Sequence, residues 1–126
     1  MIFCPDYAKV GLDEVEMRIV DEVRKIPLGQ LRAAFDAGGR ELIFGGRTII
    51  VEPSMPASGM TLFGENGFVL GREAFTSHPE LIKTLLHEIF RLTTSQSTLG
   101  VAGGLATDET NAAFSFAQRA WEAFFR

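Results

Sequence analysis

The chain has 126 residues, 46% of them hydrophobic and 22% charged, which is typical of one folded domain with its own core, here residues 1–126. Its longest apolar runs fall short of the ~20 residues of a membrane span, and a single cysteine, Cys4, excludes an internal disulfide. With 16 acidic and 12 basic residues the net charge is −4, and no basic run is present, so binding to nucleic acid is not favoured.

The first third of the chain predicts two helices. Residues 1–10 are expected to be a loose lead-in. Apolar residues then recur at helical spacing, which predicts a helix with the inner stripe Leu12, Val15, Ile19, Val23 and Ile26. Acidic residues open this segment, basic residues close it, and Pro27 ends it. A shorter helix is predicted from about Gln30 to Ala37, before Gly38-Gly39.

The pattern then changes to that of β-strands. Residues 41–44 and 47–52 flank Gly45-Gly46 and predict a β-hairpin, because paired glycines accept the positive φ of a tight turn. Two further short strands are predicted, at 60–63 and 68–70. The arginines on or beside these strands are expected at the surface, with one of them as an alternative in a cleft beside the central helix; they are Arg40, Arg47 and Arg72.

A central amphipathic helix is predicted over Leu81–Leu92. One half of its helical wheel is apolar, and the other half carries Lys83, Thr84, His87, Glu88 and Arg91. Pro79 suits the first turn of a helix, so Ser77 or His78 is expected at the cap.

A last helix is expected to begin near Thr107 or Asp108, after a mobile loop over residues 93–104. Its inner stripe is predicted to be Ala112, Ala113, Phe116, Ala117, Ala120, Trp121 and Phe124, and Glu109 belongs to the same stripe. The predicted fold is therefore α+β, with two N-terminal helices, a small, mostly antiparallel sheet and two packed helices that carry the polar site.

The polar half of the central helix differs by one residue from a zinc-hydrolase motif. His87-Glu88-x-x-Arg91 has an arginine where His-Glu-x-x-His has its second histidine; in that motif both histidines bind zinc and the glutamate acts as the base. Together with Glu109 on the following helix, the layout resembles the gluzincin branch of zinc peptidases over residues 40–126. The resemblance implies a zincin-like fold, with His87 and Glu109 as metal ligands.

Arg91 leaves the cofactor open between zinc and none. A guanidinium stays protonated and has no lone pair for a metal, so His87 and Glu109 supply only two of the three protein ligands that a catalytic zinc usually has. A third could come from His78, Asp108 or the loop 93–104, although no spacing favours any of them. In the metal-free alternative Arg91 pairs with Glu109 and stabilises an anionic transition state. His87 is then the acid/base, Glu88 orients it or acts as a second base, and hydroxyls come from Thr94 and Ser95.

Two other segments suggest a biological role. Residues 55–75 and 85–95 resemble the C-terminal toxin domains of bacterial polymorphic toxins of the Rhs and contact-dependent-inhibition types. This resemblance implies delivery as part of a larger bacterial protein, action on a macromolecule in the target-cell cytoplasm, and a cognate immunity protein as partner.

Three functional hypotheses follow. The first is an interbacterial toxin domain that is a hydrolase, with its site at His87, Glu88, Arg91 and Glu109. The second is a metal-independent ribonuclease-like toxin that uses His87, Arg91 and Thr94 or Ser95. The third is a non-catalytic binding module in which Arg91 and Glu109 form a structural pair. A plainer alternative for His87 and Arg91 is a solvated helix face.

Overall fold

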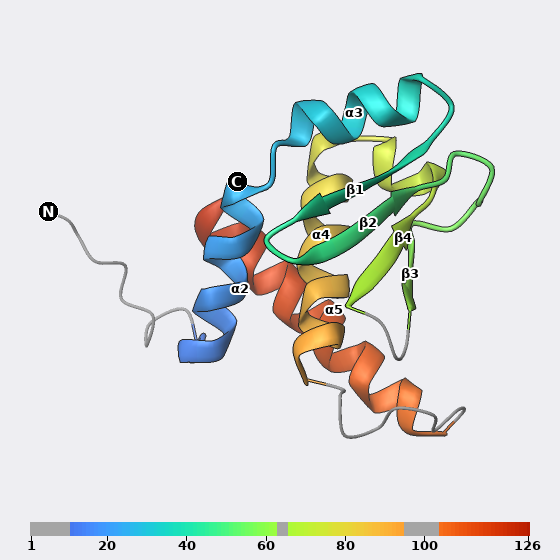
Figure 1. Cartoon of the computed structure of the whole chain (residues 1–126). Coiled ribbons are helices and arrows are strands. Elements are labelled where there is room, and N and C mark those ends of the chain that lie inside the picture. The colour runs from blue at the N-terminus through green and yellow to red at the C-terminus, as the bar shows by residue number, and fades with distance from the viewer. Residues whose placement is uncertain (1–10, 63–65, 95–103) are drawn as a thin grey trace, which may run out of the picture.

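The computed structural model describes residues 11–62, 66–94 and 104–126, except for the side chains of residues 94 and 104–111. Two helices come first, α2 (Glu14–Lys25) and α3 (Leu28–Asp36). The hairpin and the other strands are β1 (Arg40–Phe44), β2 (Arg47–Val51), β3 (Gly59–Leu62) and β4 (Gly67–Leu70). The 3-10 turn η1 (Arg72–Phe75) leads to the helices α4 (His78–Thr94) and α5 (Gly104–Phe124), as Figure 1 shows.

The four strands form a mixed sheet in the order β1-β2-β4-β3. The pairs β1–β2 and β3–β4 are antiparallel, whereas β2 and β4 are parallel. The predicted α+β fold with a small, mostly antiparallel sheet is confirmed. β3 lies at one edge of the sheet, beyond the strand that follows it in sequence.

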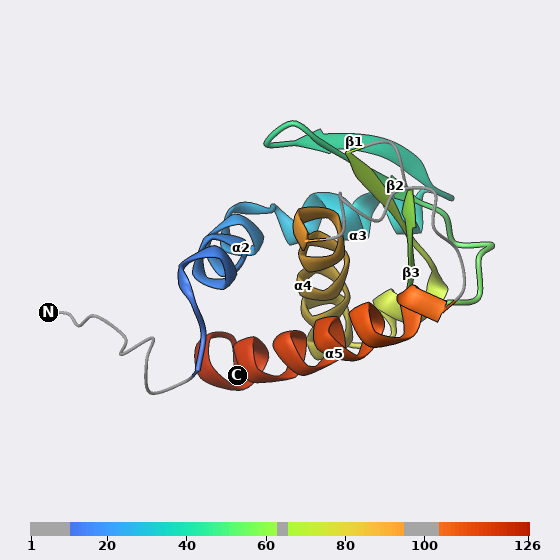
Figure 2. The same cartoon turned by 90° about the horizontal axis from the view of Figure 1, so that it is seen from below.

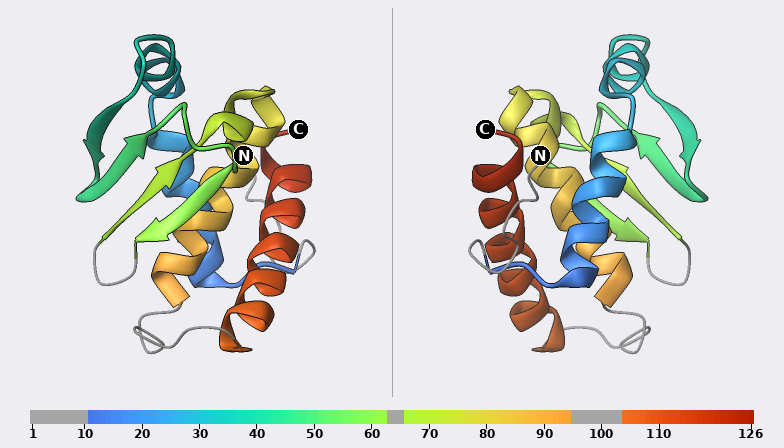
Figure 3. Two further views of the ribbon diagram at one scale, coloured as in Figure 1. Left: turned by 90° about the vertical axis from the view of Figure 1, so that its right-hand side faces the viewer. Right: turned by 90° about the vertical axis from the view of Figure 1, so that its left-hand side faces the viewer.

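Helix α4 is the centre of the molecule. The sheet lies on one side of it and α5 on the other, and α2 packs beside both helices (Figure 2). The edge strand β3 runs alongside α4 (Figure 3). Both faces of α4 are therefore covered, including the half of its wheel that carries polar residues.

Local chemistry explains where α2 begins. The carboxylate of Asp13 accepts a hydrogen bond from the backbone N–H of Glu16 at 2.8 Å, and Glu16 accepts one from the N–H of Asp13 at 3.0 Å. This reciprocal capping box satisfies two N–H groups at the start of the helix.

Val15 was wrongly predicted to face inward, because the buried stripe of α2 is centred on Val20 and leaves Val15 42% exposed.

The hairpin and α3 match the sequence pattern. Gly45 and Gly46 have φ of 57° and 80°, so the predicted tight turn is confirmed. The predicted second helix is present as α3, with Leu31 buried, and it begins two residues earlier than predicted. The ring of Phe35 stacks on that of Phe75 with 4.5 Å between centroids, which ties α3 to η1.

The last two helices begin close to their predicted positions. The N–H of Glu80 donates to Oγ of Ser77 at 3.1 Å, which confirms Ser77 as a cap of α4. Helix α5 begins at Gly104, earlier than predicted, and α4 runs on to Thr94. The ends of the loop predicted over 93–104 are thus helical, whereas residues 95–103, like the lead-in 1–10, lie outside the described residues.

The core lies between α4, α5 and the inner face of the sheet. Its fully buried large side chains include Phe68, Leu85, Leu86, Ile89 and Phe116. In the predicted α5 stripe, Ala112 is exposed and Phe124 only half-buried. No helix within the described ranges is long and apolar enough to cross a membrane.

Candidate functional site

The polar half of α4 is buried. Thr84, His87 and Glu88 are only 5%, 8% and 3% exposed. The alternative in which His87 lies on a solvated helix face is therefore wrong. Arg91 is half-buried. These side chains are buried because β3 covers the polar half of α4 from one side and α5 covers it from the other.

Glu88 is held by the edge strand. The hydroxyl of Thr61 on β3 donates to Oε1 of Glu88 at 2.6 Å. The other carboxylate oxygen, Oε2, approaches the backbone of β3 so closely that a Cβ on Gly59 would lie 2.9 Å from it. Glycine at position 59 therefore gives this carboxylate its space.

His87 lies beside this carboxylate without a hydrogen bond to it. Nε2 of His87 is 4.0 Å from Oε2 of Glu88, which is beyond hydrogen-bond range. Nδ1 is buried and has no hydrogen-bond partner among the described residues. The imidazole ring packs on Phe114 of α5, with 4.4 Å between centroids and 46° between planes.

The pKa values of the two groups move in opposite directions. Burial, assisted by the positive charge of Arg91, lowers the pKa of His87 from 6.5 to about 4, so the imidazole is neutral at pH 7. Burial raises the pKa of Glu88, although the hydrogen bond from Thr61 and the charge of Arg91 oppose the change. His87 and Glu88 therefore do not form an ion pair at neutral pH.

Both side chains line a cavity of about 450 Å³. Its walls come from the start of β3 and the loop before it, from η1, from α4 and from α5, and include Ser58, Gly59, Thr84, Phe114 and Gln118. A neutral imidazole and a carboxyl group with a raised pKa, side by side in a cavity, are suited to general acid–base chemistry.

The structure brings some of the predicted site residues together and leaves others untested. His87 and Glu88 share the cavity, and the charge of Arg91 acts on both. The helical backbone of α4 includes Thr94 and that of α5 includes Glu109, but their side chains lie outside the described part, as does Ser95 entirely. An approach of Glu109 to His87 or Arg91 stays a prediction.

The donors that the structure describes do not fit a zinc centre. No group of three or more His, Cys, Asp or Glu side chains that could hold a metal occurs among the described residues. Zinc needs neutral histidines, thiolates or carboxylates, and Arg91 stands where a second histidine would be. The assignment of His87 and Glu109 as metal ligands stays a prediction, because the side chain of Glu109 lies outside the described residues.

Sequence reasoning missed three residues of the site. Thr61 and Gly59 come from the edge strand and Phe114 from α5, and none carries a motif. The alternating pattern of the predicted strand could have assigned Thr61 to the inner face, where a threonine needs a hydrogen-bond partner.

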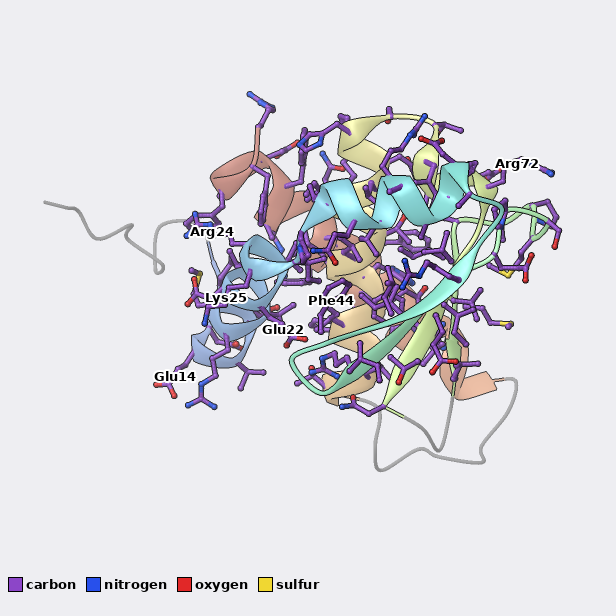
Figure 4. The ribbon with its side chains drawn as sticks, turned by 45° about the horizontal axis from the view of Figure 1, so that its top comes forward. Glu14, Glu22, Arg24, Lys25, Phe44 and Arg72 are labelled. Atoms are coloured by element: carbon purple, nitrogen blue, oxygen red, sulfur yellow. The ribbon has the colours of Figure 1, made fainter. Side chains whose placement is uncertain are left out.

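Of the arginines expected at the surface, Arg47 was predicted wrongly. Its side chain is 17% exposed and pairs with Glu22 of α2, and it also donates to Asn66 at 2.7 Å and to Thr93 at 3.4 Å. Arg72 is exposed, and Figure 4 shows it well away from Glu22. Arg47 thus links α2 and β2 to the C-terminal end of α4.

Comparison with protein families, characterised proteins and solved structures finds no match to this chain.

Proposed function

We propose that the chain is a hydrolytic toxin domain whose reaction depends on His87 and Glu88. One observation carries this proposal: a neutral imidazole and a carboxyl group of raised pKa lie 4.0 Å apart and line the same cavity. Burial of ionisable groups costs stability, and strongly perturbed pKa values are concentrated at functional sites.

In the proposed reaction Glu88 is the general base. Its raised pKa makes its carboxylate a stronger base than that of an exposed glutamate, and Thr61 fixes its orientation. A water molecule that attacks the substrate carbonyl transfers a proton to Glu88 as the new C–O bond forms. Glu88 then returns the proton to the leaving group as the bond to that group breaks.

His87 and Arg91 stabilise the charge that develops on the carbonyl oxygen. A neutral imidazole keeps one N–H donor for this oxygen, and the nearby guanidinium adds a positive charge in a partly water-excluded site. This scheme uses only the chain's own residues.

The charge of the cavity favours an amide or peptide substrate over RNA. Three carboxyl groups line it, those of Glu73, Glu80 and Glu88, against one ammonium group, that of Lys83. A phosphodiester backbone would be repelled there, because nucleic-acid binding depends on positive charge. The position of α4 beside an edge strand also agrees with the zincin resemblance, which points to peptide bonds. The bacterial setting and the immunity protein are proposed from the resemblance to polymorphic toxins.

Growth on expression tests the proposal. The full chain is expected to arrest bacterial growth with intact cellular RNA, and His87→Ala and Glu88→Gln are expected to restore growth while circular dichroism shows a folded protein. His78→Ala is the matched control, because this second histidine is exposed and its ring faces Trp121 with 6.2 Å between centroids.

Two results would count against the proposal. Arrest that persists in both folded variants removes the pair from the reaction. Degraded RNA would instead support the ribonuclease hypothesis.

A further inference from the structure

The cavity beside His87 has an unbalanced set of charges. Neither Glu73 nor Glu80 has an ion-pair partner among the described residues. The carboxylate of Glu80 accepts only a long hydrogen bond there, from Ser58 at 3.4 Å. Lys83 also lines the cavity, but its ammonium group lies 5.9 Å from the centroid of the Trp121 ring, within the range of a cation–π interaction. Within the described ranges, Lys83 therefore forms no ion pair with Glu73 or Glu80.

The walls of the same cavity are apolar. Ala57 and Ala117 line it, and so does Phe114, whose ring contacts His87 although the residue is 61% exposed. A ring that is open on its outer side can pack against an aliphatic chain or lie under a cation.

The imidazole of His87 is a buried polar group that lines this cavity. His87 is 8% exposed and lines the cavity, and the described residues provide no hydrogen bond to its imidazole. A neutral imidazole always has one acceptor nitrogen, so it is suited to a ligand that donates a hydrogen bond.

We infer that this cavity binds an organic cation on an aliphatic stem, an alkylammonium or guanidinium group of the kind that ends a lysine or arginine side chain. The stem packs on Phe114 and Ala117, and the cation lies between the carboxylates of Glu73 and Glu80. The inference rests on the proposed function, because a bound lysine or arginine side chain would make basic polypeptides the substrates of the hydrolytic site. Its test measures binding and needs no turnover.

The test is a titration of the unmodified full chain with four probes of similar length, followed by NMR. Pentylammonium and pentylguanidinium are expected to bind more tightly than neutral pentanol, and anionic pentanoate is expected to bind most weakly. The ratio between the two cations shows whether a lysine-like or an arginine-like group is preferred. Equal binding of pentanol and both cations would overturn the inference.

Charge-neutral variants identify the residues. Glu73→Gln together with Glu80→Gln is expected to weaken binding of the cations by about fivefold, as for two partly solvated ion pairs, and to leave pentanol unaffected. Glu41→Gln, on the opposite edge strand β1, is the matched control and is expected to bind like the unmodified chain. Cation binding that does not change in the folded double variant would contradict the assignment. If the double variant does not fold, the four-probe comparison still decides.

Failure of this inference can be told apart from failure of the proposed function. Cation binding without growth arrest would refute the hydrolytic role and leave the binding site in place. Growth arrest that needs His87 and Glu88, together with no preference for cations, would support the hydrolytic role and refute the cation-binding site.

Discussion

His87 and Glu88 are neighbours in sequence, yet each is buried by a different part of the fold. Thr61 and Gly59 of β3 enclose the carboxyl group, while Phe114 of α5 covers the imidazole. One unfulfilled hydrogen bond at a buried group costs roughly 1–3 kcal/mol. Among the described residues, the carboxyl group of Glu88 has a hydrogen-bond partner, whereas Nδ1 of His87 has none.

The lowered pKa of His87 predicts how stability depends on pH. Below pH 6.5 the imidazole of His87 is protonated in the unfolded chain, whereas in the folded chain it stays neutral until about pH 4. The free energy of unfolding therefore falls as the pH falls from 6.5 to about 4. The loss amounts to about 3 kcal/mol at the low end. Glu88, with its raised pKa, acts in the opposite sense, because its contribution is present below pH 4.5 and is lost as the pH rises.

Denaturant unfolding between pH 7 and pH 4 measures this effect. His87→Leu lacks the imidazole and is expected to lose about 3 kcal/mol less stability than the unmodified chain over this range. Parallel curves for the two proteins would show that the imidazole is not buried as described.

At the scale of elements, the edge strand β3 determines where Glu88 can lie. Gly59→Ala places a methyl group 2.9 Å from Oε2 of Glu88 and 3.1 Å from Cγ2 of Thr84, so one of the two must move. We expect a stability loss of about 1–3 kcal/mol, as for other overpacked sites, and a reduced growth arrest.

Gly29→Ala is the matched control for this change. Nothing lies within 4 Å of a Cβ at Gly29, which sits in helix α3. Alanine is expected to stabilise the protein there by about 0.5–1 kcal/mol, because it favours helix and restricts the unfolded chain. Equal effects at both glycines in thermal unfolding would mean that β3 does not constrain Glu88.

The elements also show what the sequence could predict. Apolar periodicity placed α2, α3 and α4 within a few residues, and Gly45-Gly46 located the hairpin, because these signals are local. The parallel pairing of β2 with β4 was not predicted, since alternation within a strand does not encode its neighbour. The cover that β3 gives to the polar arc was not predicted for a related reason: a helical wheel shows which residues share a face but not which strand covers that face.

In the candidate site, sequence reasoning found the pair and missed its surroundings. His87 and Glu88 stood out through a motif. Thr61, Gly59 and Phe114 contribute through contacts over long sequence separations, which a single sequence does not reveal.

At the scale of the whole molecule, the packing of α5 on α4 holds the site and the core together. Phe116 is fully buried and stacks on Phe90 of α4 with 5.0 Å between centroids, whereas Phe114, two residues earlier, is 61% exposed. Phe116→Ala is expected to cost about 3–5 kcal/mol of stability.

Phe114→Ala removes the same side chain from the same helix and is expected to cost about 1 kcal/mol or less, mainly through the contact with His87. Urea unfolding of both variants makes the comparison. A larger loss for Phe114→Ala than for Phe116→Ala would contradict the described orientation of α5.

The central claim is that α5 and the sheet together enclose a neutral imidazole at the middle of the fold. An NMR titration of the full chain carrying His78→Gln tests it directly, because the only remaining histidine signals then come from His87. The account predicts that the ring stays neutral as the pH falls until about pH 4. A ring in the folded protein that gains its proton near pH 6.5, the ordinary value, would contradict it.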